Sequence, residues 1–173
     1  MNKREALLYN ICKGAYAWQA LYSKSLFDGV KFPIGRCYED TGCTYKLIYN
    51  AKGIIFLDAS LYSYRIGRYG SITTSMDSKT ILERKKMSET RFIDLCRWGY
   101  RDLASVDALK LLIWYKYSDD IRDKLFKIVK QTKKDVSKEY GFKLKIMFMF
   151  LKISRRFFEN VCWVYRKKRG ITY

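Results

Sequence analysis

The chain has 173 residues, 49% of them hydrophobic and 17% aromatic, and a formal net charge of +18. This composition is typical of one folded domain and excludes a disordered chain. The chain contains no histidine, and its five cysteines form no Cys-x-x-Cys pair. These facts exclude zinc sites built on Cys and His and every histidine-dependent catalytic arrangement, so acid–base chemistry must rest on carboxylate, tyrosine, lysine or cysteine side chains.

The N-terminal region begins with a helical pattern. Apolar residues recur at helical spacing over residues 3–22, and Gly14 is a weak point within that helix. Pro33 biases the residue before it away from the helical region, so residues 32–35 are expected to form an extended loop.

A short helix and two strands are expected next. Asp40 and Thr41 offer N-cap chemistry for a helix that ends near Ala51. The β-branched run over residues 53–58 predicts a buried strand, and residues 61–66 alternate as its neighbour would. The glycine-rich stretch that follows, up to residue 75, predicts a loop.

Amphipathic helices are predicted from residue 78 onward. They cover residues 81–98, 103–117, 121–129 and 144–165. The sequence therefore predicts an α/β chain in two parts: a mixed part with few strands, residues 1–75, and a helical, basic part, residues 76–173.

Three segments of the first part stand in a specific order. They are Ala-Trp-Gln-Ala-Leu-Tyr-Ser-Lys-Ser-Leu-Phe (17–27), Phe-Pro-Ile-Gly-Arg-Cys-Tyr-Glu-Asp (32–40) and Tyr-Ser-Tyr-Arg-Ile-Gly-Arg-Tyr-Gly-Ser-Ile-Thr (62–73). Together they resemble the second, acceptor-side half of the catalytic domain of glycosyltransferase family 2 enzymes. That pattern is Trp-x-Lys-Leu-Tyr, then Phe-Pro-x-Gly with Glu-Asp just after, then Tyr-x-Tyr-Arg and Gly-Ser-Ile. Gln19 is a mild departure, because the family often has a basic residue there.

The resemblance implies a partial GT-A-like domain and a hexosyltransferase type of activity. Such an enzyme transfers sugar from a nucleotide-sugar donor to a glycan or lipid-linked acceptor in surface polysaccharide assembly. Family members begin with a nucleotide-binding half whose Asp-x-Asp motif holds a divalent metal, and we expect that half to be missing before Met1. The chain itself is then expected to hold no metal, with Mg²⁺ or Mn²⁺ bound by the missing half, and to be inactive alone. The pair Asp119-Asp120 is the only acidic pair of this kind, and it lies in a helical context.

The resemblance implies two catalytic carboxylates. Asp40 matches the second acidic position of the motif and is expected to take the proton from the acceptor hydroxyl, while Glu39 orients the site. Adjacent side chains point in different directions, so the two are not expected to share one proton. A helix start would favour the ionised form of Asp40. The alternative is that Asp40 is only an N-cap.

Two further groups are expected to bind substrate. Arg65 and Arg68, with Gly70 and Ser71 in the glycine loop, resemble the stretch that closes over the diphosphate leaving group, because guanidinium forks and exposed backbone amides bind phosphate. The alternative is a surface turn with solvated arginines.

Aromatic side chains of the first segment form the other group. Trp18 and Tyr22 are expected to stack on a sugar face. The alternative is that they are core residues at helical spacing.

The tail predicts a membrane partner. Residues 144–165 combine an apolar face with lysines and arginines and are followed by a basic run, which favours binding to an anionic membrane surface. The alternatives are a core helix or an oligomer-forming helix. No signal peptide or transmembrane segment is expected, and scattered cysteines favour reduced thiols, so we expect the chain on the cytoplasmic, inner face of the membrane.

Two other functions are compatible with the composition. A non-catalytic, basic peripheral membrane-binding module would keep the fold without the chemistry. A nucleic-acid partner is suggested by the charge alone and is not expected, because no zinc finger, ribonucleoprotein signature or leucine-zipper heptad is present.

Overall fold

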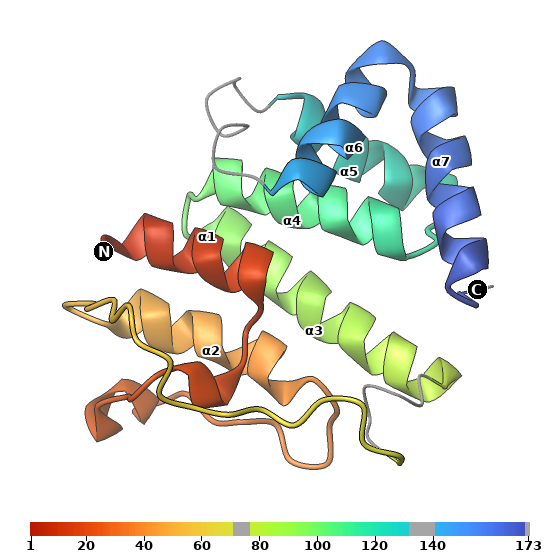
Figure 1. The fold of residues 1–173 in the computed structure, drawn as a ribbon. Helices are drawn as coiled ribbons and strands as arrows, with labels where there is room; N and C mark the ends of the chain where they lie inside the picture. The colour runs from red at the N-terminus through yellow and green to blue at the C-terminus, as the bar shows by residue number, and fades with distance from the viewer. Residues whose placement is uncertain (71–76, 132–140, 172–173) are drawn as a thin grey trace. The chain divides into compact units, whose positions relative to one another are not determined.

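A computed structural model describes residues 1–70, 77–131 and 141–171 of the chain. The chain forms two compact units, Met1–Arg91 and Phe92–Tyr173 (Figure 1). Helix α3, Ser78–Arg97, contributes its first part to unit 1 and its last residues to unit 2.

Unit 1 contains two further helices, α1 (Lys3–Lys13) and α2 (Glu39–Asn50), which pack against each other. Two short 3-10 turns, Ala17–Gln19 and Lys24–Phe27, lie between them. Helix α1 begins with a reciprocal cap: Asn2 Oδ1 accepts from the Glu5 amide, and Glu5 Oε2 accepts from the Asn2 amide, each at 2.9 Å. This arrangement satisfies two amides that a helix start otherwise leaves unpaired.

Helix α1 ends at Lys13, directly before Gly14, and the prediction of a helix over residues 3–22 is wrong beyond that point. Gly14 has φ 127°, a conformation that L side chains rarely adopt. A Cβ at this position would lie 2.5 Å from Cε2 of Tyr16. The chain therefore turns at the glycine and lays the Tyr16 ring over it.

The interface of α1 and α2 has an apolar core with one polar centre. Thr44 is fully buried; its hydroxyl accepts from Nδ2 of Asn10 at 2.9 Å. The same hydroxyl lies 2.9 Å from the Asp40 carbonyl and 3.1 Å from the Ala15 carbonyl, to either of which it donates. Around it the apolar side chains of both helices are almost without solvent exposure; they are Leu7, Ile11, Tyr45 and Leu47.

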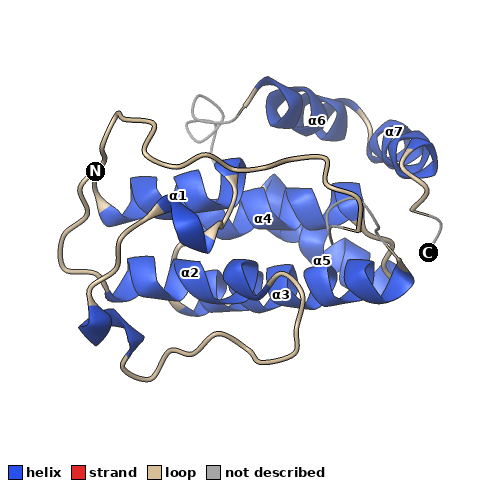
Figure 2. Cartoon of the chain, turned by 60° about the horizontal axis from the view of Figure 1, so that its bottom comes forward, coloured by secondary structure: helices blue, strands red, loops and turns tan. Residues whose placement is uncertain are grey.

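The predicted α/β class is wrong, because the described residues contain helices and no strand (Figure 2). Residues 53–66, yellow in Figure 1, are extended but pair with no other backbone as a ladder. Ile55 and Leu61 are 87% and 79% exposed, so the expected buried strand is a surface segment. A strand is stable only with neighbours, and the β-branched pattern cannot supply them.

Contacts with the N-terminal part hold this extended segment instead. The Met1 amino group donates to the Ile54 carbonyl at 3.4 Å, and the rings of Tyr9 and Phe56 lie 6.1 Å apart. Residue numbers increase along both segments from one contact to the next: Met1 contacts Ile54, Tyr9 contacts Phe56, and Tyr16 contacts Tyr64. Residues 53–64 therefore run in the same direction as α1.

Unit 2 is built around helix α4. Its helices, besides the end of α3, are α4 (Arg101–Trp114), α5 (Asp119–Lys130), α6 (Phe142–Ile153) and α7 (Arg155–Lys168). Helix α4 is buried along most of its length and packs against α5 and α7, while α6 packs against α7. Within the described residues, no helix combines the length and the apolarity needed to cross a membrane.

The predicted helix over residues 144–165 is two helices. Ser154 has φ −157° and ψ 128°, which ends α6, and its side chain caps α7 by accepting from the Phe157 amide. The apolar face expected along one straight helix is therefore divided between α6 and α7.

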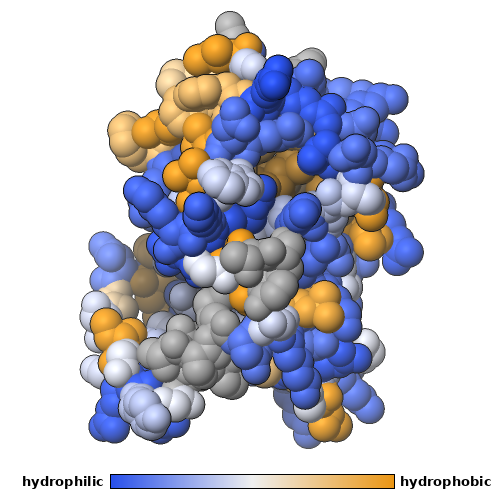
Figure 3. Space-filling view, turned by 90° about the vertical axis from the view of Figure 1, so that its right-hand side faces the viewer, coloured by the Kyte–Doolittle hydropathy of each residue, from blue (hydrophilic) through white to orange (hydrophobic). Residues whose placement is uncertain are grey.

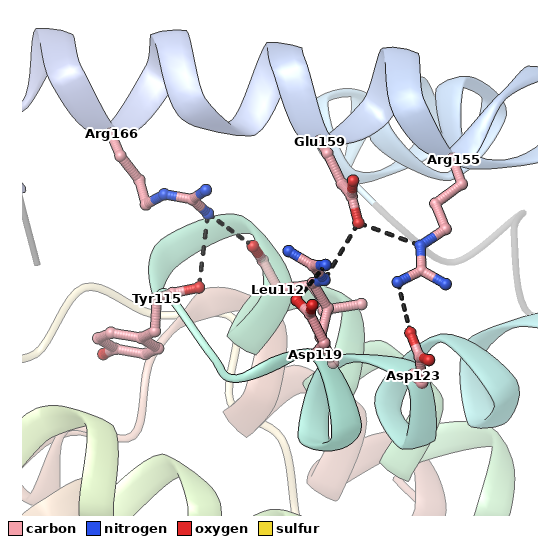
Figure 4. A network of polar contacts seen from close by, with 8 residues as sticks. Leu112, Tyr115, Asp119, Asp123, Arg155, Glu159 and Arg166 are labelled. Carbon is pink, nitrogen blue, oxygen red and sulfur yellow. Dashed lines mark hydrogen bonds and ion pairs between the residues drawn. The ribbon is translucent and has the colours of Figure 1, made fainter.

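Arg166 joins α7 to the end of α4 (Figure 4). One guanidinium nitrogen donates to backbone carbonyls at the C-terminal end of α4, where a helix has no amides of its own to pair with them. These carbonyls belong to Leu112 at 2.9 Å, Ile113 at 3.2 Å and the C-cap residue Tyr115 at 3.4 Å. Burial lowers the pKa of Arg166, and the carbonyls compensate the buried cation.

A second polar group joins α7 to α5 (Figure 4). Glu159 accepts from Nε of Arg155 at 3.1 Å and pairs with Nε of Arg122 at 3.2 Å. Arg155 also pairs with Asp123, and Arg122 with Asp119. These linked charges fix how α7 lies on α5.

Candidate functional site

Asp40 lies in the first turn of α2. Tyr38, with φ 59° and ψ 33°, is the residue before the helix, and no side chain caps it. Asp40 is the second helical residue, and its Oδ1 accepts from the Thr41 amide at 2.6 Å. The alternative that Asp40 is the N-cap is therefore wrong, and its carboxylate has one oxygen left for other contacts.

The surroundings of Asp40 raise its pKa. Burial is the largest cause, and the neighbouring Glu39 carboxylate adds to it. Hydrogen bonds from Thr41 and the charge of Arg91 oppose the rise without cancelling it. The amide at the helix start does favour the ionised form, as expected, but desolvation outweighs this contribution and the net pKa is raised.

Two tyrosines share this environment. Burial raises the pKa of Tyr22, and the Cys43 thiol and the Asp40 carboxylate raise it further. Burial is also the main cause of the raised pKa of Tyr38, on which Asp40 acts in the same direction. Tyr22 comes from the first of the three sequence segments and Asp40 from the second, so the fold brings these two segments together.

The first and third segments meet in an aromatic cluster. The ring of Trp18 stacks on Tyr62 at 4.8 Å, on Tyr64 at 5.0 Å and on Tyr16 at 5.1 Å between centroids, with interplanar angles of 13° to 19°. Trp18 is 37% exposed and Tyr62 58% exposed. Neither is a core residue, so the alternative of a buried Trp18 is wrong. We call these four rings the aromatic stack.

The sequence predicted only part of the aromatic stack. It indicated a sugar-binding role for Trp18 but no such role for Tyr16, Tyr62 or Tyr64. The available signal was the Tyr-x-Tyr spacing: on an extended segment, side chains two residues apart point to the same side. Nothing in the sequence indicated that Tyr38 lies beside Asp40 at the start of α2, because its left-handed backbone conformation is rare for a non-glycine residue.

Arg65, Arg68 and Gly70 follow directly after the stack and are exposed. Gly67 and Gly70 have φ of 73° and 74°, so this stretch turns twice. Ser71, the last residue expected in the site, lies outside the described residues. That this stretch faces Asp40 stays a prediction.

Arg36 fixes the loop that leads to Asp40. Its Nη1 donates to both carboxylate oxygens of Glu83 on α3, at 2.8 and 2.9 Å. These hydrogen bonds hold the pKa of Glu83 below its ordinary value. At Gly42, α2 comes so close to α3 that a Cβ would meet Sδ of Met87 at 2.6 Å. The helix that carries Asp40 therefore has a defined place within unit 1.

The described residues do not offer a metal site. Within residues 1–70, 77–131 and 141–171, no three Cys, Asp or Glu side chains gather closely enough to hold an ion. Glu39 and Asp40 are two carboxylates without a third ligand, so the divalent ion implied by the family resemblance does not fit these residues.

The chain is similar to one characterised protein over about half its length. It is 33% identical over 84 residues to the protein named Glycosyltransferase GlyA of Streptococcus pneumoniae serotype 4. The match covers 49% of the chain and 12% of that relative, so the chain corresponds to a small part of it. No family model matches the chain. No solved structure matches it either. The similarity shows a glycosyltransferase-like relationship.

Proposed function

We propose that this chain is the acceptor-side part of a glycosyltransferase of the family 2 type. It would take sugar from a nucleotide-sugar donor to a glycan or lipid-linked acceptor in surface polysaccharide assembly. The observation that carries the proposal is the partly buried carboxylate of Asp40, next to Tyr22 and Tyr38, in a unit where Trp18 joins the first and third segments. The relationship to a glycosyltransferase supports the same conclusion.

Asp40 acts as the general base in this proposal. As the acceptor oxygen attacks the anomeric carbon, its proton moves to the Asp40 carboxylate, and the bond from that carbon to the diphosphate oxygen breaks. A raised pKa increases the proton affinity of the carboxylate, which a base needs. Glu39 and Tyr22 orient the acceptor beside it.

The aromatic stack supplies the surface for the acceptor sugar. Trp18 stacks on the other three rings and is the least exposed of the four, while Tyr62 is the most exposed and offers its free face. Arg65 and Arg68, with Gly70 and Ser71, would meet the diphosphate of the donor. The rest of the donor site, with its divalent ion, would come from residues outside those described here.

Glycan binding by the purified chain tests the proposal. Saturation-transfer NMR with methyl hexosides and short oligosaccharides should show transfer from aromatic protons, and Tyr62→Ser should weaken it several-fold. Tyr69→Ser is the matched control, because Tyr69 lies on the same segment, fully exposed and outside the stack. The proposal fails if no glycan receives saturation, or if both variants behave alike.

Turnover tests the expectation that the chain is incomplete. The purified chain, supplied with sugar nucleotides and glycan acceptors, is expected to release no nucleoside diphosphate above background. Transfer that is lost in Asp40→Asn but kept in Asp58→Asn would show that the chain carries a whole active site. That result would contradict the incomplete part of the proposal and strengthen the role of Asp40.

A second candidate is a non-catalytic peripheral membrane module on the cytoplasmic face of the membrane. The exposed apolar and cationic residues of α6 and α7 favour it. This candidate does not need Asp40 or the aromatic stack, so the glycan-binding experiment separates the two.

A further inference from the structure

Helix α6 is apolar on two opposite faces, and unit 2 covers only one of them. Phe148 and Leu151 are 7% and 4% exposed and pack into unit 2. On the other face, Phe142, Met149 and Ile153 are 77%, 50% and 70% exposed. Ile146 completes this row at helical spacing, since positions i, i+4, i+7 and i+11 share one side of a helix. Among the described residues of unit 2, none covers Phe142, Met149 and Ile153.

The row continues onto α7. The rings of Phe150 and Phe157 meet edge to face at 5.1 Å across the break at Ser154. Phe157 and Val164, two turns apart on α7, are 47% and 45% exposed. Figure 3 shows hydrophobic side chains gathered in the upper part of the molecule, where Figure 1 places α6 and the start of α7. We call this the α6–α7 surface; it comprises Phe142, Ile146, Met149, Phe150, Ile153, Phe157 and Val164.

Cations border the α6–α7 surface on both sides. Lys145 and Lys152 follow one edge of the row on α6, and Lys143 lies at the other. Arg156 is exposed on α7 beside Phe157. In the described part of the chain, none of these four has a carboxylate partner. They differ in this from Arg155, which Asp123 and Glu159 neutralise.

A hollow beside the row has the same mixed character. It has a volume of about 400 Å³, with apolar walls from Val129, Phe148 and Leu151. Lys130 and Lys152 also line it. A hollow with cations at the edge of an apolar wall suits a phosphate group attached to a hydrocarbon chain.

We propose that the α6–α7 surface docks on the surface of an anionic lipid bilayer. The apolar row enters the boundary between headgroups and acyl chains, and the bordering lysines extend to the lipid phosphates. The hollow beside Lys152 receives one headgroup. This proposal rests on residues of unit 2 and not on Asp40, so it stands or falls separately from the proposed transferase.

The charges favour lipid over the other occupants. A second copy of the chain would bring the same unpaired lysines face to face, which is repulsive. A nucleic acid would pair with the lysines but would leave the exposed apolar row against a charged backbone. A bilayer with acidic lipids satisfies both the cations and the row.

Vesicle sedimentation with the full chain tests the proposal. Vesicles of phosphatidylcholine with about one-third phosphatidylglycerol should bind the chain at least tenfold more tightly than phosphatidylcholine alone. Met149→Glu with Ile153→Glu should weaken binding to the acidic vesicles at least about tenfold. Ile121→Glu is the matched control, because Ile121 is an exposed apolar residue on α5 outside the row, and it should change binding less than twofold.

A charge-matched pair separates this surface from net charge. Lys145→Glu with Lys152→Glu and Lys24→Glu with Lys52→Glu lower the formal net charge equally, from +18 by four units to +14. Only the first pair should reduce vesicle binding by tenfold or more, with circular dichroism showing that both remain helical. Equal losses in the two pairs, or unchanged binding in the Met149 and Ile153 variant, would overturn the proposal. The proposal would also be overturned if the chain binds random duplex DNA and the Met149 and Ile153 substitutions weaken that binding as much as they weaken vesicle binding.

Discussion

Unit 1 and unit 2 differ in where they place their large apolar side chains. Unit 1 has two complete helices and long connecting segments, and it keeps Trp18, Tyr62 and much of residues 53–66 at the surface. Unit 2 surrounds a buried α4 with other helices and joins α7 to α4 and α5 by linked charges. The comparison indicates that unit 1 carries aromatic side chains on surface loops, which is where binding residues often lie. Unit 2 exposes apolar residues mainly on α6 and α7.

The largest effect is expected in the core of unit 2. Phe158 is 1% exposed and meets Phe126 edge to face. Phe158→Ala should lower the free energy of unfolding by about 3–5 kcal/mol, because it leaves a cavity. Urea denaturation measures the change. If Trp18→Ala, at an exposed position of unit 1, lowers the free energy of unfolding by the same amount, the contrast drawn between the two units is wrong.

Arg166 comes next in size. Arg166→Met keeps the length of the side chain but leaves carbonyls at the end of α4 unpaired, which should cost about 1–3 kcal/mol of stability. Arg156→Met, on the exposed side of the same helix, should cost less than about 0.5 kcal/mol. Thermal unfolding of the two variants makes the comparison, and equal melting temperatures would contradict the role given to Arg166.

Thr44 provides the corresponding test in unit 1. Thr44→Val removes the hydroxyl that joins Asn10 to the carbonyls of Asp40 and Ala15, so it should cost about 1–2 kcal/mol. The amide of Asn10 then loses its partner inside the unit. Thr90→Val is the control, since the Thr90 hydroxyl only bonds within α3 near the surface. Urea denaturation should show a larger loss of unfolding free energy for Thr44→Val than for Thr90→Val. Equal losses would contradict the stabilising role given to the Thr44 hydroxyl.

The smallest effect is the pH dependence at Asp40. Its raised pKa means that the folded chain binds a proton there more tightly than the unfolded chain, so its contribution to stability is complete below pH 3.8 and is lost as pH rises through the folded pKa. Asp40→Asn removes the ionised form and should stabilise the chain at neutral pH by a fraction of a kcal/mol, with no gain at pH 3.

Asp77 should show the opposite sign. Hydrogen bonds that Asp77 accepts from Thr80 lower the pKa of Asp77, so its contribution to stability is present above pH 3.8 and is lost on acidification. Asp77→Asn should therefore lose stability at neutral pH and approach the parent chain at low pH. Thermal unfolding at several pH values measures both variants. The same pH trend in the two would refute the environment described for Asp40.

The helices of the second half were largely predictable, and the extended segment was not. Apolar spacing over residues 103–117 and 121–129 indicated helices close to α4 and α5, because periodicity reports which face is buried. The run over residues 53–58 has the residue types of a strand, yet whether a strand forms depends on a second strand beside it. Ser154 likewise ended a helix that the spacing alone continued, because its backbone is extended and its side chain caps α7.

The site was predictable in its residue types and not in its environment. The positions of Asp40, Trp18 and Tyr22 came from the motif, whereas the direction of the Asp40 pKa came out opposite to expectation. A local pattern gives the amides of the helix start, which lower the pKa, but burial depends on residues distant in the chain. The stacking of Tyr62 on Trp18 likewise depends on residues that are distant in the chain.

By itself, the sequence determined the excess of positive charge, the absence of histidine chemistry and most helix positions in unit 2, because these depend on composition and local spacing. Only the tertiary structure decided that residues 53–66 lie exposed along α1, that Asp40 is desolvated, and that α6 presents an uncovered apolar row. Each of these depends on which distant side chains exclude water from a group, and local periodicity carries no information about that.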